Sequence, residues 1–206
     1  MTARFEIEKR EVVLGGKAFG DAGAYEKVFG TLRFAVDPRH PLHAQITDLG
    51  SAPTNAQGQV EFAADFYVLK PVDAAKGNRR LLLDVPNRGR KVALDIFNSA
   101  PRVPDPSEAA HFGNGFLMRR GYTVAWVGWQ PDVPRQDGLM AMEVPRAKGV
   151  TGTVRVQLRP NDRVDTLPLA DRYHIPYAAA DPDQRDAKLT MRERSGAPLT
   201  EIARDK

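Results

Sequence analysis

The chain has 206 residues, of which 42% are hydrophobic and 27% are charged. This composition is typical of a folded globular protein and excludes collagen-like, coiled-coil and wholly disordered chains. The absence of cysteine excludes disulfides, thiol catalysis and cysteine-ligated metal sites. A formal net charge of +4 is a mild excess that favours solubility and does not indicate nucleic-acid binding.

The N-terminal residues 1–10 alternate charged and apolar side chains and lack the apolar run of a secretory signal. The longest apolar stretches, such as residues 81–83, are far shorter than the roughly 20 residues that span a bilayer. We therefore predict a cytoplasmic protein without a membrane span. A mature chain whose signal had been removed would give the same pattern.

The first half of the chain has the alternation of apolar and polar residues that is typical of half-buried strands. Residues 5–13 and 31–36 predict two strands joined by a glycine-containing loop. Residues 44–49 predict a third strand, and residues 59–70 predict a fourth with the most regular alternation. This half is expected to be an antiparallel sheet.

The middle of the chain predicts one βαβ unit over residues 79–128. Residues 79–85 are apolar without alternation, which predicts a strand covered on both faces and ended by Pro86. Asp105 is the expected N-cap of a following helix that ends near Gly121, and residues 122–128 predict a second buried strand.

After residue 138 the helix signals fade. Residues 139–144 and 152–158 predict short strands in antiparallel pairing. Residues 171–186 have a loop-like composition, and residues 188–194 predict a last short strand.

None of the serines, Ser51, Ser99, Ser107 and Ser195, lies in a Gly-x-Ser-x-Gly elbow, the strained turn that exposes a hydrolase nucleophile. We interpret them as turn and cap residues, and Ser107 as part of the predicted helix start. The sequence therefore predicts no catalytic residue of this kind.

The histidines give no metal site, because Pro41 breaks the helix that would align His40 with His43. His111 is expected to be a packed or surface residue, and His174 has no assigned role. No Gly-x-Gly-x-x-Gly fingerprint occurs, so no nucleotide cofactor is expected either.

The loop after the predicted strand 79–85 contains Asn87, Arg88 and Gly89, followed by Arg90 and Lys91. Loops in this position lie at the carboxyl edge of the sheet, where backbone N–H groups can face an oxyanion. The basic residues allow three interpretations: a solvated loop, an anion or substrate contact, or nucleic-acid binding. The last is disfavoured because interleaved aromatics and a recognised motif are missing.

Several stretches resemble the bacterial alpha/beta hydrolase domain-containing proteins, in order and spacing, over nearly the whole chain. They are FGDAGAYE at 19–26, DP at 37–38, ITDLGSAP at 46–53, GQVEFAAD at 58–65 and GNRRLLLDVPNRG at 77–89. The segment GFLMRRGYTV at 115–124 also resembles the first helix and following strand of α/β-hydrolases generally.

The resemblance implies an incomplete α/β-hydrolase-like sheet: an antiparallel β portion over residues 1–75, then the start of a hydrolase-like domain with a β-rich insertion over residues 76–206. Similar proteins are longer, and their serine elbow and its partners lie in a downstream region, so we expect a truncated gene or a fragment. The chain would be the N-terminal segment of a serine ester hydrolase acting on a small-molecule ester, inert alone. By position, Asn87, Arg88 and Gly89 would form its oxyanion loop.

The alternative is a non-catalytic β-rich module that binds carbohydrate or a partner protein through exposed Tyr67, Trp126 or Trp129. Trp126 lies in a buried-looking strand and favours a core role, whereas Trp129 follows that strand. If downstream strands are missing, the unpaired sheet edge would favour self-association.

Overall fold

The computed structural model describes residues 2–136, 138–170, 174–176 and 178–203. The chain divides into two compact units, Met1–Pro176 and Tyr177–Lys206. Strands from both sides of residue 75 belong to one sheet in the first unit, and the predicted division at that residue stays a prediction. Among the described residues, no helix has the length and apolar character needed to cross a membrane.

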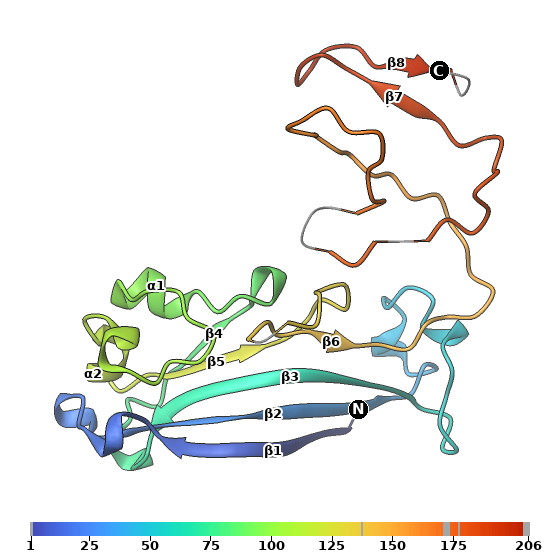
Figure 1. Cartoon of the computed structure of the whole chain (residues 1–206). Coiled ribbons are helices and arrows are strands. Elements are labelled where there is room, and N and C mark those ends of the chain that lie inside the picture. The colour runs from blue at the N-terminus through green and yellow to red at the C-terminus, as the bar shows by residue number, and fades with distance from the viewer. Residues whose placement is uncertain (1, 137, 171–173, 177, 204–206) are drawn as a thin grey trace. The chain divides into compact units, whose positions relative to one another are not determined.

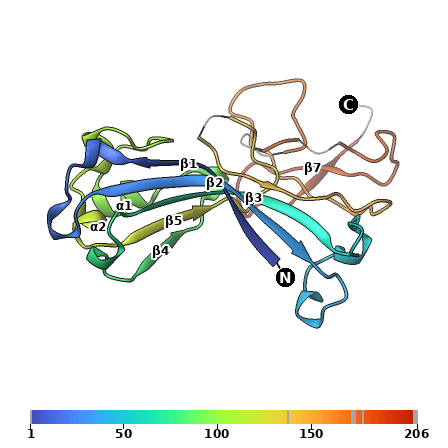
Figure 2. The same cartoon turned by 90° about the horizontal axis from the view of Figure 1, so that it is seen from below.

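The first unit contains a six-stranded mixed sheet with the order β1-β2-β3-β5-β4, in which β6 also pairs with β3. The strands are β1 Thr2–Val12, β2 Tyr25–Val36, β3 Val60–Pro71, β4 Leu81–Asp84, β5 Thr123–Val127 and β6 Met142–Glu143. Only β4 and β5 run parallel among these described pairs; the others are antiparallel (Figure 2). The predicted β-rich architecture is confirmed at this level.

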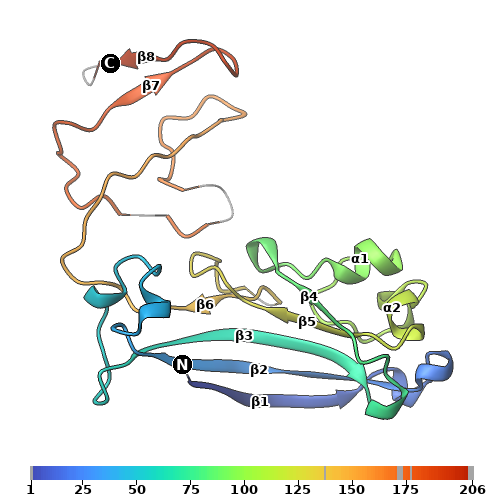
Figure 3. The ribbon, with the colours of Figure 1, turned by 180° about the vertical axis from the view of Figure 1, so that it is seen from behind.

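Two short helices, α1 Ala93–Asn98 and α2 Phe116–Arg119, connect the parallel strands β4 and β5. Both lie on the same side of the sheet (Figures 1 and 3). The predicted strand, helix and strand order is therefore confirmed. The predicted helix start at Asp105 is wrong, because its carboxylate binds Lys27 and Tyr67 instead of capping a helix.

Glycines break the segment that was expected to be one helix. A 3₁₀ helix, Ala109–Phe112, starts at Glu108 and ends at Gly113, whose φ of +53° does not continue a helix. A Cβ on Gly113 would lie 2.2 Å from the backbone oxygen of Asn98, so this close approach requires glycine. The helix resumes only as the short α2.

Two predicted strands are absent. Residues 44–48 connect the 3₁₀ helices Pro41–His43 and Leu49–Ser51, because the His40 ring caps a turn and Asp48 adopts a φ of +57°. Residues 152–158 form no strand, and most of their side chains are exposed. Their alternating apolar side chains have no sheet on which to pack.

The expectation that β4 is covered on both faces is also wrong. Leu81 is 63% exposed and Leu83 is 53% exposed, while Leu82 packs on the core. β4 is the edge strand of the sheet, and α1 and α2 protect only one of its faces.

The sheet has two different faces. The covered face packs on α1 and α2 and includes Tyr25, Tyr67, Leu69 and Trp126. The open face includes Val28, Leu32 and Phe66. Strand alternation separates the two sets.

The second unit contains the antiparallel pair β7 Leu189–Met191 and β8 Thr200–Ile202. β7 lies within the strand predicted over residues 188–194, and β8 was not predicted. Residues 171–173 and 177 of the predicted loop lie outside the described residues.

Candidate functional site

Asp84, the last residue of β4, fixes the loop that follows the strand. Its Oδ2 accepts the backbone N–H groups of Val92 at 2.9 Å and Ala93 at 2.8 Å, and the indole N–H of Trp126 at 2.6 Å. One carboxylate oxygen therefore joins the end of β4, the start of α1 and the neighbouring strand β5.

The predicted loop residues form a 3₁₀ helix, Asn87–Gly89, directly after β4. Asn87 is exposed, whereas Gly89 is buried. Gly89 has a φ of +74°, and a Cβ there would lie 2.6 Å from the backbone oxygen of Met140. This position therefore requires glycine, and the loop is pressed against the segment that leads to β6.

Arg88 is the central residue of this loop. It adopts a φ of +57°, and its backbone N–H donates to Gln130 Oε1 at 2.8 Å. Gln130 follows β5, so the contact joins the carboxyl ends of the two parallel strands. The N–H is thus directed at an amide oxygen on the edge of the sheet where α/β folds bind ligands.

The Arg88 side chain belongs to a charged cluster with Asp132 and His174. Arg88 Nη1 lies 3.6 Å from Asp132 Oδ1, and His174 Nδ1 lies 3.1 Å from Asp132 Oδ2. The Ile175 backbone N–H also donates to the Asp132 carbonyl at 2.9 Å. Arg88 Nη1 and His174 Nε2 are buried, and neither has a hydrogen-bond partner within the described part of the chain.

This arrangement has the parts of an acid–base and anion-binding site. A carboxylate on Nδ1 fixes the orientation of the imidazole and leaves Nε2 to exchange a proton. The guanidinium nitrogen adds a fixed positive charge beside it. Buried polar atoms without partners are uncommon in folded proteins and often mark functional positions.

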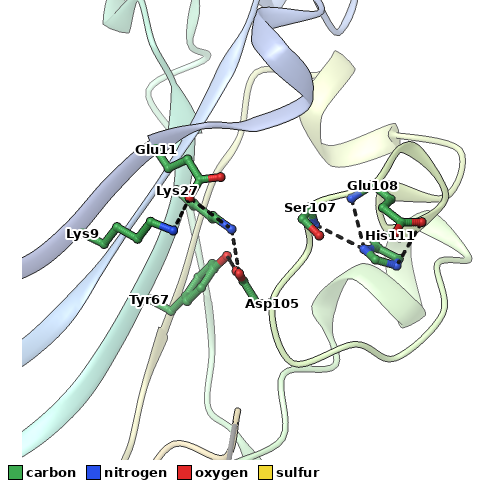
Figure 4. A network of polar contacts seen from close by, with 8 residues as sticks. All are labelled: Lys9, Glu11, Lys27, Tyr67, Asp105, Ser107, Glu108 and His111. Carbon is green, nitrogen blue, oxygen red and sulfur yellow. Dashed lines mark hydrogen bonds and ion pairs between the residues drawn. The ribbon is translucent and has the colours of Figure 1, made fainter.

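Ser107, Glu108 and His111 lie together but do not form a catalytic triad (Figure 4). His111 Nδ1 accepts the backbone N–H groups of Ser107 and Glu108, each at 3.2 Å. The contact uses the Ser107 backbone and not its hydroxyl, so the arrangement is the capping box of the 3₁₀ helix. His111 is a capping residue, consistent with its predicted structural role.

A second polar network lies on the covered face (Figure 4). Buried Lys27 donates to Asp105 Oδ2 at 2.7 Å, and the Tyr67 hydroxyl donates to Asp105 Oδ1 at 2.7 Å. Burial raises the pKa of Tyr67 well above its usual range. Burial opposes ionisation of Asp105, yet the bonds from Lys27 and Tyr67 hold the pKa of that carboxyl below its usual value. The network ties the segment before α2 to the sheet.

The two other basic residues of the loop are placed differently. Arg90 is exposed, and its backbone N–H donates to the Asn87 carbonyl at 3.3 Å. Lys91 is half-buried, with its Nζ 4.8 Å from the centroid of the Tyr67 ring.

The remaining predicted candidates serve local structure or the core. His40 Nδ1 accepts the Leu42 N–H, and His43 Nδ1 contacts the Asp37 carbonyl. No group of three acidic or histidine side chains in the described ranges is placed to hold a metal ion. Tyr67 and Trp126 are buried, so the exposure considered for them is wrong, whereas Trp129 is 50% exposed.

The sequence interpretation missed Asp84, Gln130, Asp132 and His174. Gln130 and Asp132 had a usable signal, because they directly follow the second predicted strand of the βαβ unit. His174 had none, since its pairing with Asp132 joins loops far apart in the chain.

Comparison of the chain with protein-family models, with curated proteins and with solved structures found no match.

Proposed function

We propose that this chain forms the opening part of an α/β-hydrolase-type serine ester hydrolase and that its Asn87–Gly89 loop stabilises the oxyanion of a small-molecule ester. The observation that carries the proposal is the Arg88 N–H, which is directed at the Gln130 amide oxygen at the carboxyl end of the parallel strands. An ester carbonyl that becomes an oxyanion needs such a fixed N–H donor. Displacement of the Gln130 side chain would free this donor for substrate.

The sheet supports the same assignment. The antiparallel strands β1 to β3 lead into the parallel pair β4 and β5, which we take as the first βαβ unit of a hydrolase-like sheet. The Arg88, Asp132 and His174 cluster adds charge at the edge of the sheet where the loop lies. In this proposal residues 1–75 are scaffold, and the loops of residues 76–206 face the substrate.

The serines of this chain are not placed to act as its nucleophile. Ser51 and Ser195 are exposed, Ser99 follows α1 in a left-handed conformation, and Ser107 precedes the capping box and donates its backbone N–H to His111. We therefore expect the chain alone to hydrolyse simple esters at the background rate. Without a nucleophile and its base, binding and oxyanion contacts give little rate enhancement.

The test is hydrolysis of nitrophenyl esters by the purified chain and by its four single Ser→Ala variants. All five proteins are expected to match the buffer rate. Turnover that survives repurification and disappears in one serine variant would show that a serine of this chain is the nucleophile and would overturn the proposal.

A second candidate is a non-catalytic module that binds carbohydrate or protein. Trp129 favours it, because its indole N–H donates to the Pro86 carbonyl at 2.9 Å while half of the residue stays exposed. A shallow hollow of about 640 Å³, lined by residues of β1, β2, β3 and β6 that include Phe34 and Phe62, offers a second surface. Saturable quenching of tryptophan fluorescence by an oligosaccharide, lost in Trp129→Ala, would support this candidate. No quenching across an oligosaccharide panel would argue against its carbohydrate form.

A further inference from the structure

The two edge strands of the main sheet, β1 and β4, differ in how they are protected. β1 has a register irregularity between Ile7 and Lys9. Its charged side chains are Arg4, Glu6, Glu8, Lys9, Arg10 and Glu11. Bulges and charges on an edge strand oppose pairing with another chain. β4 pairs with β5 without such an irregularity, and three leucines precede its charged residue Asp84, so of these two edges β4 is better suited to accept a further strand.

The backbone groups of Leu81 and Leu83 point away from the sheet. The first residue of β5 donates its N–H to the Arg80 carbonyl at 3.0 Å, and in a parallel ladder alternate residues face the same neighbour. Arg80, Leu82 and Asp84 therefore bond toward β5. This leaves the N–H and C=O groups of Leu81 and Leu83 at the free edge, where no loop backbone of the described ranges bonds to them.

Two charged side chains flank this edge on the covered face of the sheet. Arg80 is exposed and forms no ion pair within the described part of the chain. Asp84 Oδ2 accepts three N–H groups, whereas Asp84 Oδ1 has no donor among the described residues. One cation and one carboxylate oxygen are therefore left for a partner.

We propose that a second copy of this chain pairs with β4, antiparallel, about a two-fold axis at Leu82. Leu81 then lies opposite the partner's Leu83, so the outward N–H and C=O groups of both residues bond to each other. Arg80 lies opposite the partner's Asp84 at each end of the contact, and opposite charges in this arrangement are favourable. The contact is independent of the proposed ester hydrolysis.

The charges favour this occupant and this register. A two-fold axis at Leu83 would also let outward backbone groups pair. It would place Arg80 opposite the partner's Pro86, which carries no charge, and each Asp84 carboxylate would face an apolar side chain, the partner's Leu82. A second copy supplies both the cation and the carboxylate at the matching positions by symmetry. Because the paired strands are short, we expect a weak dimer.

Sedimentation velocity of the full chain at increasing concentration tests the contact. Arg80→Asp replaces two attractive pairs with two repulsive ones and is expected to weaken the dimer about tenfold or more. Lys17→Asp makes the same change of charge at an exposed position outside β4 and should leave association unchanged. Circular dichroism checks the fold of both variants. A parent chain that stays monomeric at every concentration, or equal association of the two variants, would overturn the proposal.

Introduced cysteines test the register, because the chain has none of its own. Leu81→Cys mixed with Leu83→Cys is expected to form a disulfide between the two chains under mild oxidation. Opposite Cα atoms in such a pair lie about 5.5 Å apart, which a disulfide can span. Each variant alone should cross-link much less, because equivalent positions lie diagonally, about 7–8 Å apart.

Non-reducing gel electrophoresis and peptide mass spectrometry read the cross-links. Faster cross-linking of Leu83→Cys with itself than with Leu81→Cys would place the axis at Leu83 and overturn the proposed register. Cross-linking of the mixture no faster than that of Lys17→Cys, an exposed position outside β4, would overturn the contact itself.

Discussion

The two faces of the main sheet are stabilised in different ways. On the covered face, polar side chains are anchored within the packing, as with the Asp84 carboxylate on the Trp126 indole and the Lys27 ammonium on Asp105. On the open face, aromatic rings contact one another, as with Phe5 on Phe66 at 5.1 Å and Phe34 on Phe62 at 4.8 Å.

This difference separates the face that fixes the candidate site from the face that we propose for association. The covered face fixes the segment after the Asn87–Gly89 loop, because the Asp84 carboxylate accepts the backbone N–H groups of Val92 and Ala93. The open face has one buried carboxylate, Glu26, which pairs with Lys70 at 2.6 Å, and this face includes the exposed leucines of β4. Four predictions test this contrast.

The two tryptophans give the largest expected contrast. Trp126→Ala removes a ring that is 1% exposed on the covered face, and we expect a loss of about 3–5 kcal/mol in the free energy of unfolding. Trp129→Ala, at a half-exposed ring, is expected to cost about 1 kcal/mol or less. Urea denaturation followed by circular dichroism measures both losses. Equal losses in the two variants would contradict a core role for Trp126 and a surface role for Trp129.

Asp84→Ala leaves three N–H donors without their acceptor, and we expect a loss of about 2–3 kcal/mol. Asp84→Asn keeps one acceptor oxygen and should lose less. The matched control is Asp95→Ala, whose ion pair with exposed Arg102 should contribute less than about 1 kcal/mol. Denaturation curves compare the three, and a control loss as large as that of Asp84→Ala would refute the anchoring role.

We expect Asp105 to make the free energy of unfolding depend on pH in the acid range. Its pKa is lowered in the folded state, so the unfolded chain binds a proton first as the pH falls. The contribution is present above the ordinary aspartate pKa, about 3.9, and is lost as the pH drops through the folded value. Because half of this side chain is exposed, solvent screening limits the effect to about 1 kcal/mol.

Stability curves of Asp105→Asn measured against pH should therefore be flatter in acid than those of the parent chain. Exposed Asp162→Asn is the control and should leave the curve unchanged. An unaltered acid slope in Asp105→Asn would show that the Lys27 and Tyr67 contacts do not favour the charged carboxylate.

The smallest effect on stability is expected on the open face. Leu83→Lys places a charge at a 53% exposed position of the edge strand β4 and should change the free energy of unfolding by less than about 0.5 kcal/mol. We propose that the chain self-associates through this edge, and the substitution should then decrease association, because charged residues on sheet edges oppose strand pairing. Sedimentation velocity at increasing concentration detects the change, and association that persists would place the contact elsewhere.

The sequence predicted strands that have a neighbouring strand to pair with. Residues 59–70 alternate clearly, and the strand forms between β2 and β5. Residues 152–158 alternate too, but the described chain gives them no strand to pair with. At residues 44–49, turns around Pro41 and Asp48 replace the predicted strand. Strand signals therefore predict structure only where tertiary pairing is available.

The candidate site was predicted only in part. The position of residues 87–89 after a strand was enough to place the loop at the carboxyl edge of the sheet. The partners of that loop were not predictable, since Gln130 and His174 reach it only through tertiary contacts.

The most direct measurement of the central claim is fluorophosphonate labelling of the native gene product, recovered with an antibody against residues 1–206. Mass spectrometry then identifies the labelled residue and the intact mass of the protein. Our account predicts a product heavier than the 22.8 kDa of this chain, labelled on a serine outside these 206 residues. Labelling of Ser51, Ser99, Ser107 or Ser195, or an unlabelled product of 22.8 kDa, would contradict it.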